Sequence, residues 1–236
     1  MNSGIRDAHN FAWKAGLVVK DKFPEALLET YELERKPHAR ALIEMAVIMG
    51  RFIMPASKLG AWIIQWGMMI SRIIPVAHDY IAQMKFKPRP FFRHGLLNGN
   101  QSLIGRLFIQ PHVERPDRSI ELLDDVIGNS FTCLLFGLPD EDQTICLEQT
   151  VGNETPISWL WVTPRNYMPR NDGNIPQVRD INGAVEKAIK GFTDYAVLLR
   201  PDHYVSALIP RNLLKDPNCF QNIFGPKFFK KIIVSL

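Results

Sequence analysis

Apolar residues recur at helical spacing through the first ninety residues of the chain, and no segment there alternates as a strand does. The pattern from about Asn2 to Lys20 predicts one helix, with Asn2 or Ser3 placed to cap it and Asp7 near its positive end. Its apolar stripe consists of Ile5, Ala8, Phe11, Ala12, Ala15, Val18 and Val19. Phe23-Pro24 then predicts a break.

Further helices are predicted after this break. Glu25–Lys36 has helical spacing, and Pro37 predicts a bend or a restart because its ring blocks regular helix geometry. His38–Met54 is apolar around much of its circumference and is therefore expected to be well buried. Leu59–Ser71 is uncharged over 13 residues, whereas a membrane-spanning helix needs about 20. We expect a buried or interfacial helix there and no membrane span.

The pattern changes between Lys85 and Asn100, where prolines and glycines predict a linker. Beyond it, helical stretches at about 140–150 and 182–190 separate short runs typical of strands, with a hairpin around Pro201-Asp202-His203. The predicted strands are Gly105–Gln110, Phe131–Gly137, Ile157–Thr163, Tyr195–Arg200 and Tyr204–Ile209. Alternating strands and helices predict a small α/β domain.

Composition supports a folded chain with two dissimilar parts. The 236 residues are 46% hydrophobic, which is enough for a sizeable core and excludes general disorder. Residues 1–98 carry 14 basic and 8 acidic side chains, whereas residues 99–236 carry 14 and 16. Such a split favours two units that differ in partner or origin, and a basic half suits an anionic partner.

Several classes of function are disfavoured. Three widely spaced cysteines, Cys133, Cys146 and Cys219, form no CxxC pair, which argues against a disulfide framework and favours a reducing, cytoplasmic location for a soluble protein. The six histidines include no i, i+4 pair, so no metal site is predicted. Lys85–Arg93 mixes basic residues with three phenylalanines, but its prolines favour a linker over a nucleic-acid surface.

Two motifs carry a specific resemblance. The segment MNSGIRDAHNFAWK resembles the last FAD-binding motif of the flavoprotein aromatic hydroxylases, in which a Gly-Met-Asn-x-Gly-x-x-Asp-Ala-x-Asn-Leu-x-Trp-Lys run opens a helix beneath the flavin. YELERKP, at 31–37, resembles the Tyr-x-x-Glu-Arg-x-Pro stretch that follows in that family. The resemblance is greatest to enzymes of the 3-(3-hydroxyphenyl)propionate and phenol hydroxylase type, which carry a thioredoxin-like domain after the flavin domain; RPDHYV, at 200–205, resembles the hairpin of that domain.

The resemblance implies an oxidoreductase chemistry. NADH or NADPH would reduce FAD, and the reduced flavin would activate oxygen to hydroxylate a phenolic aromatic small molecule. It implies that Met1, Asn2 and Ser3 bind the cofactor, with the backbone N–H groups of Met1 and Asn2 donating to the flavin pyrimidine carbonyl. The dipole of the helix would favour negative charge on the reduced ring. Asp7 is expected to brace this turn, and Trp13, Tyr31 and Arg35 to serve packing and ion pairing.

The expected fold class is therefore α/β, with the helical C-terminal remnant of an FAD-binding domain at 1–95 and a thioredoxin-like domain at 96–236. The Gly-rich dinucleotide fingerprint of the family is absent from this sequence, so the chain resembles a fragment that begins at an internal methionine and is not competent alone. Without a CxxC pair, the second domain is expected to act as a scaffold or as a contact in a homo-oligomer.

Two other interpretations remain open at this stage. The chain is alternatively a non-catalytic interaction or dimerisation module, or the remnant of a decaying gene. A weaker hypothesis makes Met49–Ile74 a region that lies on a membrane surface, because it is rich in Met and Trp.

Overall fold

The computed structural model describes residues 2–71, 91–139, 157–171 and 173–215. The chain divides into two compact units, one formed by Met1–Leu33 with Phe92–Leu236 and the other by Glu34–Phe91. The larger unit contains a seven-stranded sheet with helices, so the chain is of mixed α/β class as predicted.

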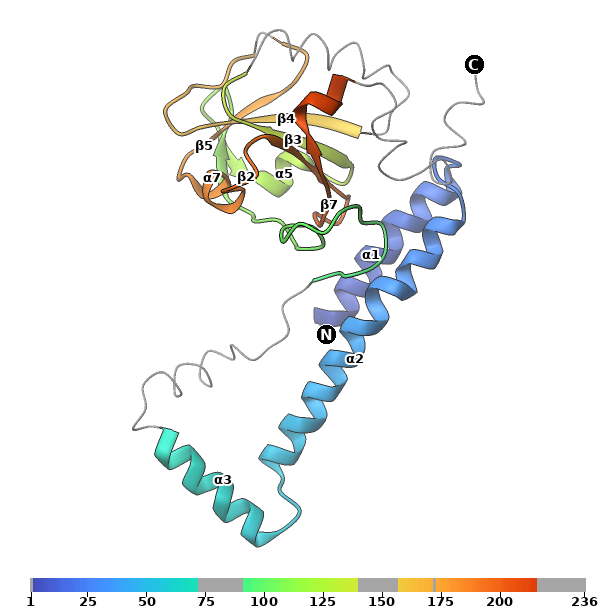
Figure 1. Ribbon diagram of the computed structural model, residues 1–236, viewed down its shortest axis with the longest axis vertical. Helices are drawn as coiled ribbons and strands as arrows, with labels where there is room; N and C mark the ends of the chain where they lie inside the picture. The colour runs from blue at the N-terminus through green and yellow to red at the C-terminus, as the bar shows by residue number, and fades with distance from the viewer. Residues whose placement is uncertain (1, 72–90, 140–156, 172, 216–236) are drawn as a thin grey trace. The chain divides into compact units, whose positions relative to one another are not determined.

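Three long helices occupy the first part of the chain: α1 (Asn2–Val19), α2 (Ala26–Ile53) and α3 (Lys58–Ser71). The predicted first helix and the break after it are confirmed. Asp21 ends the turn after α1 in a left-handed conformation, with φ of 55°, and Lys22 N–H donates to the Leu17 carbonyl. In Figure 1, α1 and the first part of α2 lie side by side, and the edge of the Phe11 ring meets Tyr31 at a centroid distance of 5.6 Å.

The restart predicted at Pro37 is wrong, because α2 runs through this residue as one helix. Pro37 removes a single N–H from the backbone ladder, while its neighbours include several strong helix formers that continue the helix on both sides. The predicted burial of 38–54 is wrong as well. Ile43 and Ile48 are each 64% exposed within the part of the chain that the structure describes.

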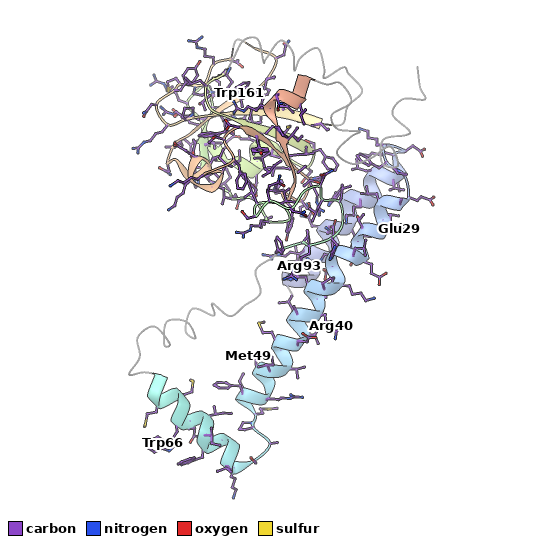
Figure 2. All side chains as sticks on the ribbon, in the orientation of Figure 1. Glu29, Arg40, Met49, Trp66, Arg93 and Trp161 are labelled. Atoms are coloured by element: carbon purple, nitrogen blue, oxygen red, sulfur yellow. The ribbon has the colours of Figure 1, made fainter. Side chains whose placement is uncertain are left out.

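Helix α3 also carries apolar side chains on its surface. Trp62 and Trp66 are 57% and 51% exposed, and their rings lie 5.7 Å apart; the Trp66 side chain projects from the helix in Figure 2.

No single helix among the described residues is long and apolar enough to cross a membrane. The bent pair formed by 26–53 and 58–69, with 99° between its helices, passes that test by length and composition only.

The sheet of the larger unit has the strand order β2-β1-β5-β4-β3-β6-β7. Strands β3, β4 and β5 are parallel, and the pairs at both sides of them are antiparallel. The strands are β1 (His112–Glu114), β2 (Ile120–Leu122), β3 (Phe131–Phe136), β4 (Ile157–Thr163), β5 (Gln177–Asp180), β6 (Tyr195–Leu199) and β7 (Val205–Pro210). Two short helices, α5 (Leu123–Ile127) and α7 (Ala184–Ala188), and a 3-10 turn at Arg211–Lys215 complete the described elements.

Apolar side chains cover both faces of the sheet, those of α1 on one face and those of α5 and α7 on the other. Alternate residues of β3 point to opposite faces, with Cys133 and Leu135 toward α1 and Leu134 toward α5 and α7. This double burial explains why β3 reads as a continuous apolar run. Ile157, Trp159 and Trp161 of β4 all lie in the core cluster on the α1 face.

Four of the five predicted strands are confirmed, as is the helix within 182–190, and the helix predicted at 140–150 lies outside the described residues. The strand predicted at Gly105–Gln110 is wrong: Gly105 has a φ of 78°, and the segment has isolated bridge residues at Arg106 and Leu107 instead of a strand, Leu107 pairing with Tyr204. Strands β1, β2 and β5 were not predicted because each has only three or four residues and little apolar alternation.

Gly105 gives the first prediction. A Cβ at this position would clash with the Phe92 carbonyl, which the left-handed backbone brings against it, whereas Gly191 has φ of 89° and nothing within 4 Å of its Cβ position. Gly105→Ala is therefore expected to lower the free energy of unfolding by about 2–4 kcal/mol, and Gly191→Ala by about 1–2 kcal/mol from backbone strain alone. Urea unfolding of both variants measures the difference. Equal losses would contradict the close approach at Gly105.

Candidate functional site

The amino-terminal turn of α1 contains the residues expected to bind the cofactor. Asn2 and Ser3 lie in its first turn, where backbone N–H groups have no partner within the helix, while Met1 and the side chains of Asn2 and Ser3 lie outside the described residues. No acidic side chain occurs in this turn, and the space around Gly4 is open. Helix geometry therefore leaves the N–H groups of this turn without an intrahelical partner, at the positive end of an 18-residue helix. The assignment of Met1, Asn2 and Ser3 stays a prediction.

The same motif also supplies the face by which α1 packs on the sheet. Trp13 and Lys14 both lie about one turn after Asn10, and the three residues are 9%, 0% and 2% exposed, respectively. The edge of the Trp13 ring meets Phe131 of β3 at a centroid distance of 5.6 Å. Packing is therefore the observed role of Trp13, and a large part of the motif fixes the position of the helix.

A buried ion pair in the β6–β7 hairpin meets this face of α1. Arg200 is fully buried and Asp202 is 5% exposed; the guanidinium donates from Nε to Oδ1 at 2.9 Å and from a terminal nitrogen to Oδ2 at 2.6 Å. Asn10 Nδ2 donates to the same Oδ2 at 2.9 Å. One carboxylate therefore joins the hairpin to the helix, across 192 residues of sequence.

Aromatic rings enclose the Arg200 guanidinium. Its central carbon lies 5.3 Å from the Trp13 ring centroid, 5.2 Å from that of Phe92 and 5.7 Å from that of Tyr204. The Phe92 and Tyr204 rings stack at 4.2 Å. A planar guanidinium suits this arrangement, because it stacks on rings while its edge donates to a carboxylate.

Burial would by itself raise the pKa of Asp202, but stronger effects act in the opposite direction. The charge of Arg200, its hydrogen bonds, and the nearby side chains of Trp13 and Asn10 together hold the pKa below its ordinary value of 3.8. Asp202 is therefore ionised at neutral pH. The sequence predicted the hairpin but not this ion pair; the one available signal was an Arg and an Asp two residues apart in a turn between apolar strands.

Comparison with known proteins identifies both parts of the chain. Residues 1–46 match the model of an FAD binding domain, and residues 105–217 match that of the HcaD C-terminal domain. The 3-(3-hydroxy-phenyl)propionate/3-hydroxycinnamic acid hydroxylase of Mycolicibacterium smegmatis is 31% identical over 215 residues, which cover 87% of this chain and 38% of that protein. The protein of the same name from Klebsiella pneumoniae strain 342 is 32% identical over 220 residues, with 90% and 40% covered.

The chain is homologous to the C-terminal part of the flavoprotein aromatic hydroxylases. It spans about two fifths of the length of these relatives. Solved structures show the same fold: the flavin-dependent monooxygenase PieE, in complex with FAD and substrate, has a TM-score of 0.65 at 19% identity, covering 94% of this chain and 44% of its own. Aklavinone-11 hydroxylase, with FAD and aklavinone, has a TM-score of 0.62 at 17% identity, covering 94% and 40%.

These matches confirm the predicted resemblance and FAD as the cofactor of the family. The first turn of α1 in this hydroxylase homologue fits the electron-rich edge of a flavin, because it offers N–H donors, open space at Gly4 and no carboxylate. No group of three or more potential metal ligands occurs among the described residues. Cys133 is fully buried inside β3 and belongs to the core cluster on the α1 face.

The buried pair gives a second prediction. Asp202→Asn leaves Arg200 without its countercharge and is expected to lower the free energy of unfolding by about 3–5 kcal/mol. Arg200→Met should cost a similar amount, and the double variant should cost clearly less than the two single losses together. Glu121→Gln is the control, because its pair with Arg115 is 39% and 36% exposed and should contribute under about 1 kcal/mol. Additive losses in urea unfolding would contradict the coupling.

The pKa of Asp202 gives a third prediction. A carboxyl whose pKa is lowered by folding contributes stability above its unfolded value of 3.8, and this contribution is lost as the pH falls through the lower folded value. The chain should therefore lose stability from about pH 4 downward, and Asp202→Asn should show a shallower loss over the same range. Thermal unfolding monitored by circular dichroism at several pH values tests this. Parallel curves for the two proteins would contradict it.

Proposed function

We propose that this chain is the C-terminal part of an FAD-dependent monooxygenase that uses NADH or NADPH to hydroxylate a phenolic aromatic substrate. The supporting observation is the coincidence of the FAD-domain match at 1–46 with an α1 whose first turn has N–H groups without an intrahelical partner and whose later turns, from Asn10 onward, pack on the sheet unit. The relatives named as hydroxylases of 3-(3-hydroxy-phenyl)propionate support the phenolic class.

Bound FAD would supply the redox chemistry and activate oxygen. The contribution of this chain is to bind and orient: the backbone N–H groups at Met1 and Asn2 would donate to the flavin pyrimidine carbonyl, and the α1 dipole would stabilise negative charge there. Because Asn10, Trp13 and Lys14 fix α1 on the sheet, these donors are held in one orientation before the cofactor arrives.

We further propose that residues 96–236 form a thioredoxin-like domain that acts as a scaffold or as a contact in a homo-oligomer, with residues 1–95 belonging to the flavin domain. The parallel β3, β4 and β5 with antiparallel β6 and β7, covered by helices on both faces, support this assignment. Burial of Cys133 argues against thiol exchange at that residue.

Sedimentation of the chain tests the proposed homo-oligomer, and a strict monomer at high concentration would count against it.

The function is tested by joining this chain to the part of a relative that lies outside the match. The segment of the Klebsiella pneumoniae relative that precedes the matched region is fused ahead of Met1, and FAD retention and phenol-dependent NAD(P)H oxidation are measured. We expect the fusion to retain FAD and the 236-residue chain alone to retain none, because the family's Gly-rich fingerprint is absent from the sequence. Tight FAD binding by the chain alone would contradict the proposal, and an inert but folded fusion would favour the non-catalytic module.

The donor role is tested in the same fusion with Asn2→Pro. Proline removes the N–H and is tolerated at the first helical position, so the helix persists while one flavin donor is lost. FAD retention should weaken by about tenfold, the value of one hydrogen bond. Asn2→Ala keeps the N–H and is the matched control. Equal affinities of the two variants would argue that the backbone at Asn2 does not touch the flavin.

A further inference from the structure

A cleft of about 600 Å³ lies between α1 and the amino ends of β3 and β4, within the larger unit. The function proposed above does not use it. One wall is the face of α1 from His9 to Leu17 and the turn after the helix; the other is the loop before β3 with the first residues of β3 and β4. The lining residues are His9, Ala12, Trp13, Gly16, Leu17, Lys20, Lys22, Asn129, Ser130, Phe131, Ile157, Ser158 and Pro201. The volume is in the range typical of small-molecule sites.

The floor of the cleft is apolar and firmly held. Trp13, Phe131 and Ile157 are 9%, 3% and 6% exposed and belong to the core cluster on this face of the sheet. The loop that precedes β3 is fixed by His203, whose Nε2 lies 2.9 Å from the Gly128 carbonyl oxygen. Rings and aliphatic groups at the floor favour a ligand with an apolar, ring-sized body.

The rim of the cleft carries positive charge. Lys20 and Lys22 line it from the turn after α1, both side chains are exposed, and the lining residues that the structure describes include no Asp or Glu. Among the described residues, neither lysine has a carboxylate partner. The carboxyl end of a helix repels anions, but the turn after α1 has two lysines, one on either side of Asp21, and so carries a net positive formal charge. The rim therefore favours an anionic group.

Two hydroxyl groups on the opposite wall complete the polar surface. Ser130 Oγ and Ser158 Oγ lie 3.3 Å apart at the adjacent starts of β3 and β4. When one hydroxyl donates to the other, the second still has its own O–H to donate to a ligand. A carboxylate accepts from a hydroxyl and from ammonium groups at once.

We propose that this cleft binds a small amphiphilic anion, namely an aromatic body bearing one carboxylate. The body packs on Trp13 and Phe131, and the carboxylate meets Lys20, Lys22 and the free serine hydroxyl. The proposal goes beyond the monooxygenase function and is independent of it, because binding requires neither flavin nor NAD(P)H.

The test uses the purified 236-residue chain and calorimetric titration at constant ionic strength. 3-Phenylpropionate is expected to bind at one site per chain. 3-Phenylpropan-1-ol, which has the same shape without the charge, should bind at least about tenfold more weakly, since it lacks the charge-assisted hydrogen bonds. Inorganic phosphate should not displace the carboxylate, because it has no apolar body. Absence of saturable binding, equal binding of the alcohol, or displacement by phosphate would each overturn the proposal.

Variants separate the charge of the cleft from its volume. Lys20→Gln with Lys22→Gln should weaken 3-phenylpropionate binding by about tenfold, whereas Lys187→Gln with Lys190→Gln, which removes the same charge in and after α7, should leave it unchanged. Gly16→Leu should abolish binding by filling the cleft. A Cβ at Gly16 meets nothing within 4 Å, and leucine favours helix more than glycine, so this variant should remain folded. Binding that survives Gly16→Leu, or falls equally with the α7 pair of changes, would overturn the proposal.

Discussion

The ion pair between Arg200 and Asp202 is the interaction on which the arrangement of the larger unit depends. It lies in the hairpin of the sheet, yet its carboxylate also accepts a hydrogen bond from Asn10 of α1. Two charges buried this deeply are costly unless every polar atom is paired and the geometry is close to ideal. Fixing the hairpin therefore fixes the helix, and with it the direction in which the amino-terminal turn of α1 points.

The sequence predicted those parts of the fold whose physical cause is local. The stripe of α1 and the apolar runs of β3, β4, β6 and β7 follow from periodicity, because each is long enough to show a period and is buried on a definite face. The predictions failed where a distant contact decides the conformation. Gly105–Gln110 has the composition of a strand, but Gly105 lies against Phe92 in a conformation that a regular ladder does not allow.

The prediction for the helical unit, residues 34–91, was wrong for a different reason. The prediction that 38–54 is buried rests on apolar residues around most of the helix. Such a pattern indicates that the helix surface favours burial, but it does not identify the surface against which the helix packs. Ile43, Ile48, Trp62 and Trp66 are exposed in the part of the chain that the structure describes. A sequence pattern cannot distinguish a core helix from a helix whose partner surface is elsewhere.

Of the candidate site, the sequence predicted only the part that belongs to the motif at the start of the chain. The motif located the first turn of α1, but composition and spacing contained no sign that Asn10 would bond with Asp202 across 192 residues. Likewise, nothing in the sequence placed Lys20 and Lys22 opposite Ser130 and Ser158, since the fold alone brings these segments together. Long-range pairing of polar groups is a property of the tertiary structure.

Burial of Asn10, Trp13 and Lys14 has a consequence for how such motifs are used to assign function. These three positions of the cofactor-helix motif are buried within the chain's own fold, so they can persist in a protein that never meets the cofactor. A match at these positions in another protein sequence therefore indicates only that the helix packs against the rest of the fold. Only the residues of the first turn of α1, which precede these positions, would indicate that a ligand binds at that turn.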